Sequence, residues 1–199
     1  MVVLPSCPFP NHLWYHNCLK SNTAVVDIHE NYIKQSLRNR FYILEVHGKL
    51  GLTVPVEGQD GQKTRVKDIR IARGKWNKLH FTALKSAYGK SPFFEHFEDE
   101  FARFWERKFN FLVDFNEASV ALINDWIGLE PRYTLSTEYV DPCAGDKRPS
   151  FKGPSPDASI HYQQVFSDRH AFVGNLSILD LVFNMGTETA AYLDDVRFS

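Results

Sequence analysis

The densest group of polar side chains in this chain lies in the run HENYIKQSLRNR, from His29 to Arg40. The run follows an apolar segment, and loops that leave strand ends are where α/β proteins usually bind ligands. Arg38 and Arg40 can hold a phosphate or a carboxylate through paired N–H donors, with Asn39 beside them. The alternative is a solvated loop whose arginines make surface ion pairs of little stabilising effect.

His80 is the second residue that can do chemistry. It lies between Trp76 and Leu84 on a stripe of apolar residues at helical spacing, where a titratable ring is unexpected. Two interpretations stay open. His80 is either a core histidine with satisfied hydrogen bonds or a general base that contacts substrate, and a carboxylate partner in the structure would favour the base.

A third polar group lies near the C-terminus. In an extended backbone Tyr162 and Gln164 share one face. Asn175 has a side chain suited to capping the helix expected after it, because asparagine accepts from otherwise unpaired N–H groups. Asp180 and Asn184 are four residues apart and share one face of that helix, where each polar group needs a partner or solvent.

These groups are far apart in sequence, and each would be costly to bury without a polar partner. We therefore predict that one concavity brings them together, with His80 as the catalytic residue and the others as substrate contacts. The set comprises Arg38, Asn39, Arg40, His80, Tyr162, Gln164, Asn175 and Asp180. The alternative is a buried polar network that braces a sheet against helices.

Apolar runs and helical stripes predict the elements that position these residues. Strands are expected at 2–6, 24–28, 41–46, 52–57, 66–72 and 133–140, the third and fourth forming a hairpin around HGKLG. Helices are expected at 11–20, from 76 to a stop at Gly89, at 92–108, from 114 or 116 to about 128, and after Asn175. The pattern predicts a single α/β domain over residues 1–199, with a mixed β-sheet, N-terminal strands, a helical middle and a C-terminal helix.

Residues 141–159 form a segment rich in Pro, Gly, Ser and charge that exceeds the usual length of a loop. This segment is expected to be a mobile loop or lid that partly roofs the predicted concavity. The run GQDGQK at 58–63 is expected to be a solvated loop.

Charge and hydropathy exclude several classes of partner. The formal net charge of -1 argues against general capture of nucleic acid, which requires a basic surface. No run of about 18 apolar residues is present to span a membrane. The N-terminus lacks the basic start of a signal peptide, and Pro5, Pro8 and Pro10 interrupt its apolar run. We therefore expect a cytoplasmic protein without nucleic-acid or membrane partners.

The cysteines give no sign of a metal site. Cys7, Cys18 and Cys143 are odd in number and lack the C-x-x-C spacing of zinc ligands, which suits reduced thiols. Cys7 has no base near it in sequence that would activate a nucleophile. Motifs for phosphate loops, dinucleotide binding and nucleophile elbows are absent from the sequence, and it does not identify a cofactor.

Four ordered blocks of this sequence resemble the WbqC-like family of bacterial proteins. They are PFPNHLWY, then ENYIKQSLRNR followed by LTVPV, then WNKLHFTALKSAYGKSPFFEHF, and last YQQVF with NLSILDLVFNMG and AYL. The blocks span nearly the whole chain in the expected order. The resemblance implies a cytoplasmic step in the modification of a sugar precursor of O-antigen or another surface polysaccharide.

Under this first hypothesis the protein is a transferase that moves an acyl or aminoacyl group to a sugar. The Arg38/Arg40 loop would hold an anionic acyl donor or a nucleotide-sugar phosphate, His80 would be the base, and Asn175 or Asp180 would orient the substrate. The expected partner is therefore a small molecule.

The second hypothesis is a non-catalytic binding or assembly module in a biosynthetic complex. It accounts for the missing catalytic signatures and for the aromatic content of 14%, because large aromatics are frequent at interfaces. A deep pocket lined by the candidate residues favours the enzyme, and a flat exposed Phe/Trp patch favours the module. The sequence leaves the oligomeric state open.

Overall fold

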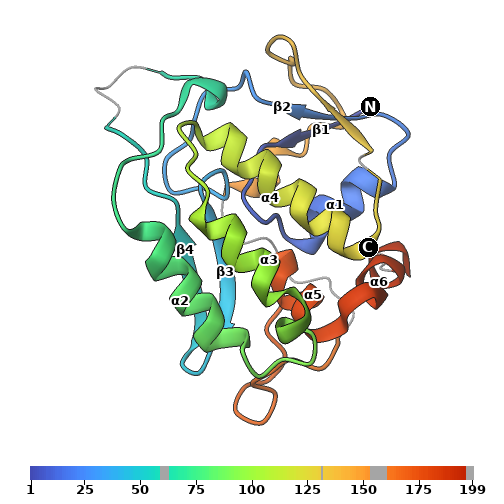
Figure 1. The fold of residues 1–199 in the computed structure, drawn as a ribbon. Coiled ribbons are helices and arrows are strands. Elements are labelled where there is room, and N and C mark those ends of the chain that lie inside the picture. The colour runs from blue at the N-terminus through green and yellow to red at the C-terminus, as the bar shows by residue number, and fades with distance from the viewer. Residues whose placement is uncertain (59–62, 131, 153–160, 196–199) are drawn as a thin grey trace.

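The strands form two small sheets instead of one mixed sheet. The computed structural model describes residues 1–58, 63–130, 132–152 and 161–195. A parallel sheet in the order β1-β2-β5 is built from Val2–Pro5, Ala24–Asp27 and Tyr133–Leu135, and an antiparallel hairpin from β3 (Arg40–Glu45) and β4 (Gly48–Thr53). The α/β class, the N-terminal strands and the helical middle agree with the sequence-based prediction (Figure 1).

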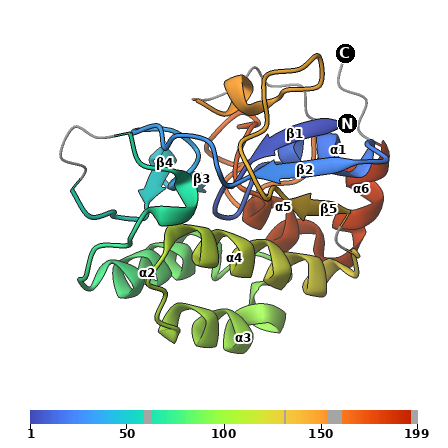
Figure 2. The same ribbon diagram turned by 90° about the horizontal axis from the view of Figure 1, so that it is seen from above.

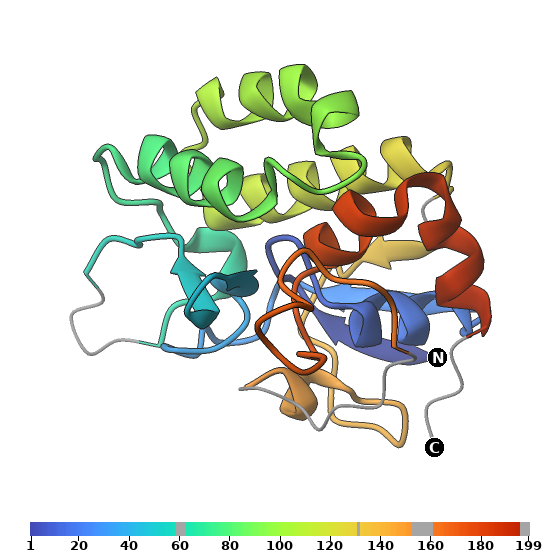
Figure 3. The same cartoon turned by 90° about the horizontal axis from the view of Figure 1, so that it is seen from below.

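Three helices from the middle of the chain form two layers beside the strands. The α-helices are α1 (His12–Leu19), α2 (Trp76–Tyr88), α3 (Phe94–Glu106), α4 (Leu112–Ile127), α5 (Ile178–Met185) and α6 (Thr189–Asp195). The short 3-10 helices are η1 (Val66–Asp68), η2 (Arg148–Phe151) and η3 (Gly186–Glu188). Figures 2 and 3 show α2 and α4 next to the strands and α3 outside them. None of the described helices is both long and apolar enough to cross a bilayer.

The parallel sheet brings three chain segments to one edge. Pro5 pairs with Asp27 across β1 and β2, and Val26 pairs with Leu135 across β2 and β5. Because the strands are parallel, the residues that follow them leave from the same side. Ser136 is the first residue after β5, and its backbone N–H still donates to the carbonyl of Val26 at 2.9 Å. Ser136 therefore lies beside the end of β2.

The first part of the predicted lid packs against the sheet. Val3 and Asp146 form a parallel bridge, and the backbone N–H of Lys147 donates to the carbonyl of Val3 at 2.9 Å. Phe151 is buried at the end of η2. Residues 141–152 thus cover β1, whereas 153–159 lie outside the described residues.

The strand predicted at 66–72 is wrong. The segment begins with η1 and then makes only single bridges, from Ile71 to Val56 and from Arg70 to Phe111. Val66 and Ile69 are both fully buried and three residues apart, which matches one turn of a 3-10 helix and not the alternation of a strand.

Two further boundaries differ from the prediction. The predicted strand at 133–140 ends at Leu135, because the hydroxyl of Ser136 turns toward Asp27. The hairpin turn is shorter than HGKLG: β4 begins at Gly48, whose φ of 111° suits a position that glycine adopts without strain. Leu79, which precedes His80 on α2, is 69% exposed.

Phe9 is the centre of an aromatic core that joins the loop after β1 to the helices and the hairpin. Its ring lies 5.2 Å from that of Phe41, 5.4 Å from that of Phe104 and 5.8 Å from that of Trp105. Its backbone has a φ of 39°, a left-handed conformation that costs a non-glycine residue about 1–3 kcal/mol. Burial of the ring must offset that strain.

Replacing Phe9 with Ala is expected to lower the free energy of unfolding by about 3–5 kcal/mol, because a fully buried ring leaves a cavity. Urea denaturation followed by circular dichroism measures the change. Leu79→Ala is the matched control, since Leu79 is exposed and its truncation should cost no more than about 0.5 kcal/mol. A loss for Phe9→Ala as small as for the control contradicts the assigned core.

Candidate functional site

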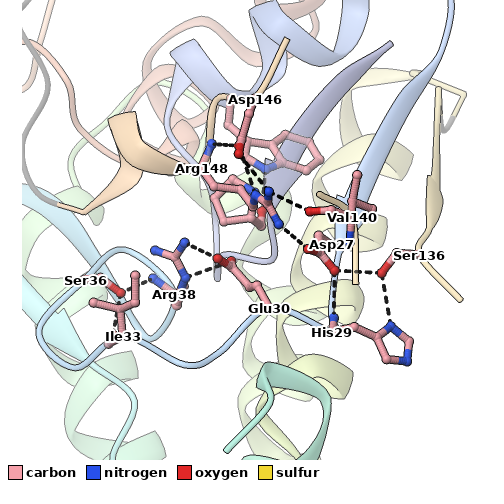
Figure 4. A network of polar contacts seen from close by, with 12 residues as sticks. Asp27, His29, Glu30, Ile33, Ser36, Arg38, Ser136, Val140, Asp146 and Arg148 are labelled. Carbon is pink, nitrogen blue, oxygen red and sulfur yellow. Dashed lines mark hydrogen bonds and ion pairs between the residues drawn. The ribbon is translucent and has the colours of Figure 1, made fainter. Parts of the chain in front are cut away.

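The carboxylate of Asp27 lies at the carboxyl end of β2 and is completely buried. Its Oδ1 accepts hydrogen bonds at 2.9 Å from the backbone N–H of His29 and from the hydroxyl of Ser136. Its Oδ2 accepts from Nη1 of Arg148 and from the backbone N–H of Val140. A buried charge requires such partners, so Asp27 ties the segments after β2 and β5 to the start of η2 (Figure 4).

Arg148 supplies the positive charge that this carboxylate needs. Its Nε and Nη2 also donate to the two oxygens of Asp146 at 2.9 and 2.7 Å, and Nη2 donates to the carbonyl of Val140 at 2.8 Å. The guanidinium lies 5.2 Å from the centre of the Tyr139 ring. Hydrogen bonds from Arg148 lower the pKa of Asp146, and their effect raises the pKa of Arg148 in turn. Both groups remain charged at neutral pH.

A second buried ion pair lies next to the first. Nε and Nη2 of Arg38 donate to the two oxygens of Glu30 at 2.8 and 2.6 Å, and the Arg38 side chain is 0% exposed. Burial raises the pKa of Glu30 even though Arg38 acts in the opposite direction. The carbonyl of Arg38 accepts from Nδ2 of Asn116 at 3.0 Å, and the same Nδ2 donates to Oγ of Ser6. Arg38 thus braces the β2–β3 loop against α4, and Asn116 links both to the residue after β1.

His29 and Ser136 extend the network toward solvent (Figure 4). Oγ of Ser136 donates its proton to Asp27, accepts from the backbone N–H of Ile28 at 3.2 Å, and lies 3.1 Å from Nδ1 of His29. Because the serine proton is already used, this arrangement favours the tautomer in which Nδ1 of His29 donates. Nε2 then carries a lone pair, and it has no hydrogen-bond partner among the residues that the structure describes. A half-buried imidazole of this kind can accept a proton from a bound substrate.

The predicted arginine loop does not present its side chains as one anion site. Arg38 is committed to Glu30, and Asn39 is buried with Nδ2 donating to the carbonyl of Val54 at 2.9 Å. Arg40 is half-buried as the first residue of β3, and its Nε donates to Oγ1 of Thr53 at 2.8 Å.

Arg40 and Asn175 do line one narrow cavity, together with Cys7, but its volume of about 10 Å³ has room for about one water molecule. Asn175 has a φ of 54° and accepts from Nδ2 of Asn11, so the predicted cap is wrong. Ser177 caps α5 instead, accepting from the backbone N–H of Leu179. Burial raises the pKa of Cys7, which keeps it a thiol.

Tyr162, Gln164 and Asp180 lie together, but as an internal brace and not as the lining of the predicted concavity. The Tyr162 hydroxyl donates to Oδ2 of Asp180 at 2.5 Å, and Nε2 of Gln164 donates to the same oxygen at 2.9 Å. Gln164 also exchanges two hydrogen bonds with the backbone of Val173. Burial raises the pKa of Asp180 and that of Tyr162. The cluster fastens the segment 161–173 to α5.

His80 lies among aromatic rings. Its ring centre is 5.3 Å from that of Trp76, 5.7 Å from that of Trp105 and 6.2 Å from that of Phe41. Nδ1 is buried without a hydrogen-bond partner in the described structure, and burial lowers the pKa of His80 to about 4. The carboxylate partner that would favour a general base is not among its described contacts. These surroundings are those of a packing residue.

The eight candidates therefore occupy four places instead of one concavity. The physical reason is that most of these side chains already form hydrogen bonds or ion pairs with buried partners. They therefore stabilise the fold and do not face a common ligand site. Asp27, His29, Ser136 and Arg148 were missed. The sequence signal for the first two was their position in DIHE at the end of a buried strand, whereas the other two carry no local signal. Within the described residues, no three His, Cys, Asp or Glu side chains are placed to hold a metal ion.

Replacing Arg38 with Gln should lower the free energy of unfolding by about 3–5 kcal/mol, because Glu30 keeps a buried charge without a cation. The double variant Arg38→Gln/Glu30→Gln should recover part of this loss, since no charge is then left unpaired. Lys85→Ala breaks the exposed pair with Glu98 and is expected to cost less than about 1 kcal/mol. Chemical denaturation separates the three cases, and equal losses for Arg38→Gln and Lys85→Ala contradict the bracing role.

Replacing His80 with Phe should reduce the decrease in the free energy of unfolding that occurs as the pH falls. An unfolded histidine takes up a proton near its ordinary pKa of 6.5, whereas folded His80 does so only near 4, so falling pH favours unfolding across this window. The wild type should lose about 3 kcal/mol more than His80→Phe between these two pH values. Urea titrations at pH 7, 5.5 and 4 measure the difference. The exposed His47, changed to Gln, is the control, and parallel pH profiles for all three proteins would rule the burial effect out.

Comparison with known families gives one match. A sequence model of the WbqC-like protein family matches residues 6–149, more than half of the chain. The matched part includes Asp27, His29, Ser136 and Arg148 and ends before the C-terminal helices. No curated protein and no solved structure matches the chain significantly. The match to the family covers the whole of the polar network at the carboxyl edge of the sheet, and the chain belongs to the WbqC-like protein family.

Proposed function

We propose that this protein is a cytoplasmic enzyme that modifies a sugar precursor of a surface polysaccharide of the O-antigen type, by transfer of an acyl or aminoacyl group. His29 is the general base in this proposal, in place of His80. The observation that carries it is the chain of contacts from Asp27 through Ser136 to Nδ1 of His29, which leaves Nε2 of a half-buried imidazole available.

The transfer step needs a base for the nucleophile. Nε2 of His29 takes the proton from a sugar hydroxyl or amine while the sugar oxygen or nitrogen attacks the acyl carbonyl. The new ester or amide bond forms, the bond from the acyl carbon to the donor's leaving group breaks, and the proton passes to that group. Ser136 acts through His29 by holding the ring orientation, so it is a positioning residue.

The location of the network supports an enzyme. It lies at the carboxyl ends of parallel strands, where open α/β sheets usually bind ligands. The proposal requires a small-molecule partner and neither nucleic acid nor a membrane.

A non-catalytic assembly module has less support. The large apolar side chains that are exposed in the described structure come from separate elements, and Phe93 is the one Phe or Trp among them. These residues are Met1, Leu79, Phe93, Leu135 and Tyr139. An assembly surface of the expected kind would bring several such side chains into one patch.

Changing His29 to Gln should lower kcat for transfer by about 10²–10⁴-fold at unchanged thermal stability, which is the usual contribution of a general base. The assay combines a panel of nucleotide sugars with acyl-coenzyme A and aminoacyl donors, and mass spectrometry detects the modified sugar. Ser136→Ala should cause a smaller loss, with KM unchanged. His96→Gln, an exposed change on α3, is the control. Absence of product from the folded wild type with every donor contradicts the transfer reaction, and full activity of His29→Gln contradicts the assigned base.

A further inference from the structure

A cleft that is remote in sequence from the Asp27 network has the size of a ligand site. Its volume is about 520 Å³, within the range of about 300–1,000 Å³ that small-molecule sites occupy. It lies between the segment that precedes α2, the first turn of α2 and the connection from α3 to α4. In Figures 1 and 2 the start of α2 and the end of α3 lie at the same end of the helical layer.

The lining of this cleft is strongly basic. Arg70, Arg73, Arg107 and Lys108 face one carboxylate, that of Glu57, so four positive and one negative side chain leave a net charge of +3. The whole chain has a formal net charge of -1, which makes the cluster a local feature. Neighbouring positive charges repel one another, and a bound anion would relieve this repulsion.

These cations lack the structural role that Arg38 and Arg148 have. None of the four makes an ion pair with a carboxylate within the part of the chain that is described, and all four are exposed. Two of them are held by aromatic rings: Arg70 lies 4.8 Å from the centre of the Phe111 ring, and Arg107 lies 4.9 Å from that of Phe109. Such stacking orients a guanidinium while its N–H donors stay available.

The backbone adds donors at the same place. α2 begins at Trp76, and the preceding Lys75 offers no side-chain hydrogen bond to the first turn, which also contains no acidic residue. The first N–H groups of a helix lack internal partners and favour anions. Gly74 has a φ of 155° and open space where a side chain would begin, so the backbone is accessible there.

Trp76 gives the cleft an apolar wall. Its indole is half-buried, 6.1 Å from the ring of Trp105 and 5.5 Å from that of Phe115, which fixes its orientation. A rigid, partly accessible indole is suited to stacking against a flat ring.

We propose that this cleft binds the diphosphate group of a small phosphorylated ligand, and that this ligand is a nucleoside diphosphate that also contacts Trp76. The basic side chains and the start of α2 hold the phosphates, and the indole contacts the base or sugar ring. This inference goes beyond the proposed function, because it concerns a separate cleft and depends on binding alone and not on the transfer step.

Isothermal titration calorimetry with pyrophosphate, UDP and uridine tests the assignment. Pyrophosphate and UDP should bind, uridine should not, and added salt should weaken both interactions. The charge reversal Arg73→Glu/Arg107→Glu should weaken them by about tenfold or more. Lys78→Glu, the same change at an exposed position of α2 that does not line the cleft, should leave the affinity within about twofold.

The outcomes separate the possible sources of the ligand. Tighter binding of UDP than of pyrophosphate assigns a nucleoside diphosphate, and equal binding assigns the diphosphate group by itself. Failure of both to bind the folded protein, or unchanged affinity in Arg73→Glu/Arg107→Glu, overturns the proposal. If the double variant does not fold, the exposed single changes Arg73→Gln and Lys108→Gln replace it. His29→Gln should bind UDP like the wild type, so loss of transfer and loss of binding are distinguishable.

Discussion

The need to satisfy one buried carboxylate organises the edge of the parallel sheet. Asp27 ends β2 at a position without solvent, where an unpaired charge would be prohibitively costly. Its partners come from the turn after β2, from Ser136 after β5 and from Arg148 at the start of η2. Arg148 in turn recruits Asp146, which bridges to β1. The arrangement of the strand ends therefore follows from how this charge is compensated.

The same compensation gives the candidate base its orientation. The hydroxyl of Ser136 has one proton, which it donates in its hydrogen bond to Asp27. Its oxygen can therefore only accept a hydrogen bond from the imidazole of His29. The carboxylate thus acts on the imidazole through a hydroxyl. The arrangement leaves the outer nitrogen of His29 as the acceptor, and a base at the end of a parallel strand is where the fold can present it to a ligand. The atoms that compensate the buried charge are therefore also the ones that orient the proposed base.

Local patterns in the sequence were sufficient for much of the fold. The first helix near Asn11, the β3–β4 hairpin and the helices α3 and α4 depend on residues close in sequence, and such patterns are visible there. The Asp27 network depends on Ser136 and Arg148, which are 109 and 121 positions away from Asp27 in sequence, and nothing in the spacing of these two residues indicates the contact. The strand prediction for residues 66–72 was wrong for a different reason, because apolar residues buried at intervals of three were interpreted as a strand.

The arginines explain why the predicted site differed from the candidate site. In sequence, Arg38 and Arg70 look equally able to bind an anion. The structure separates them by whether a carboxylate has been buried beside the guanidinium: Glu30 lies against Arg38, while Arg70 and Arg107 lie against aromatic rings and keep their donors exposed. If the arginine of a buried ion pair moved to a ligand, its carboxylate partner would be left as a buried, unpaired charge, which is strongly destabilising. Burial of the acidic partner, more than the density of arginines in a loop, therefore decides which cations are available for binding.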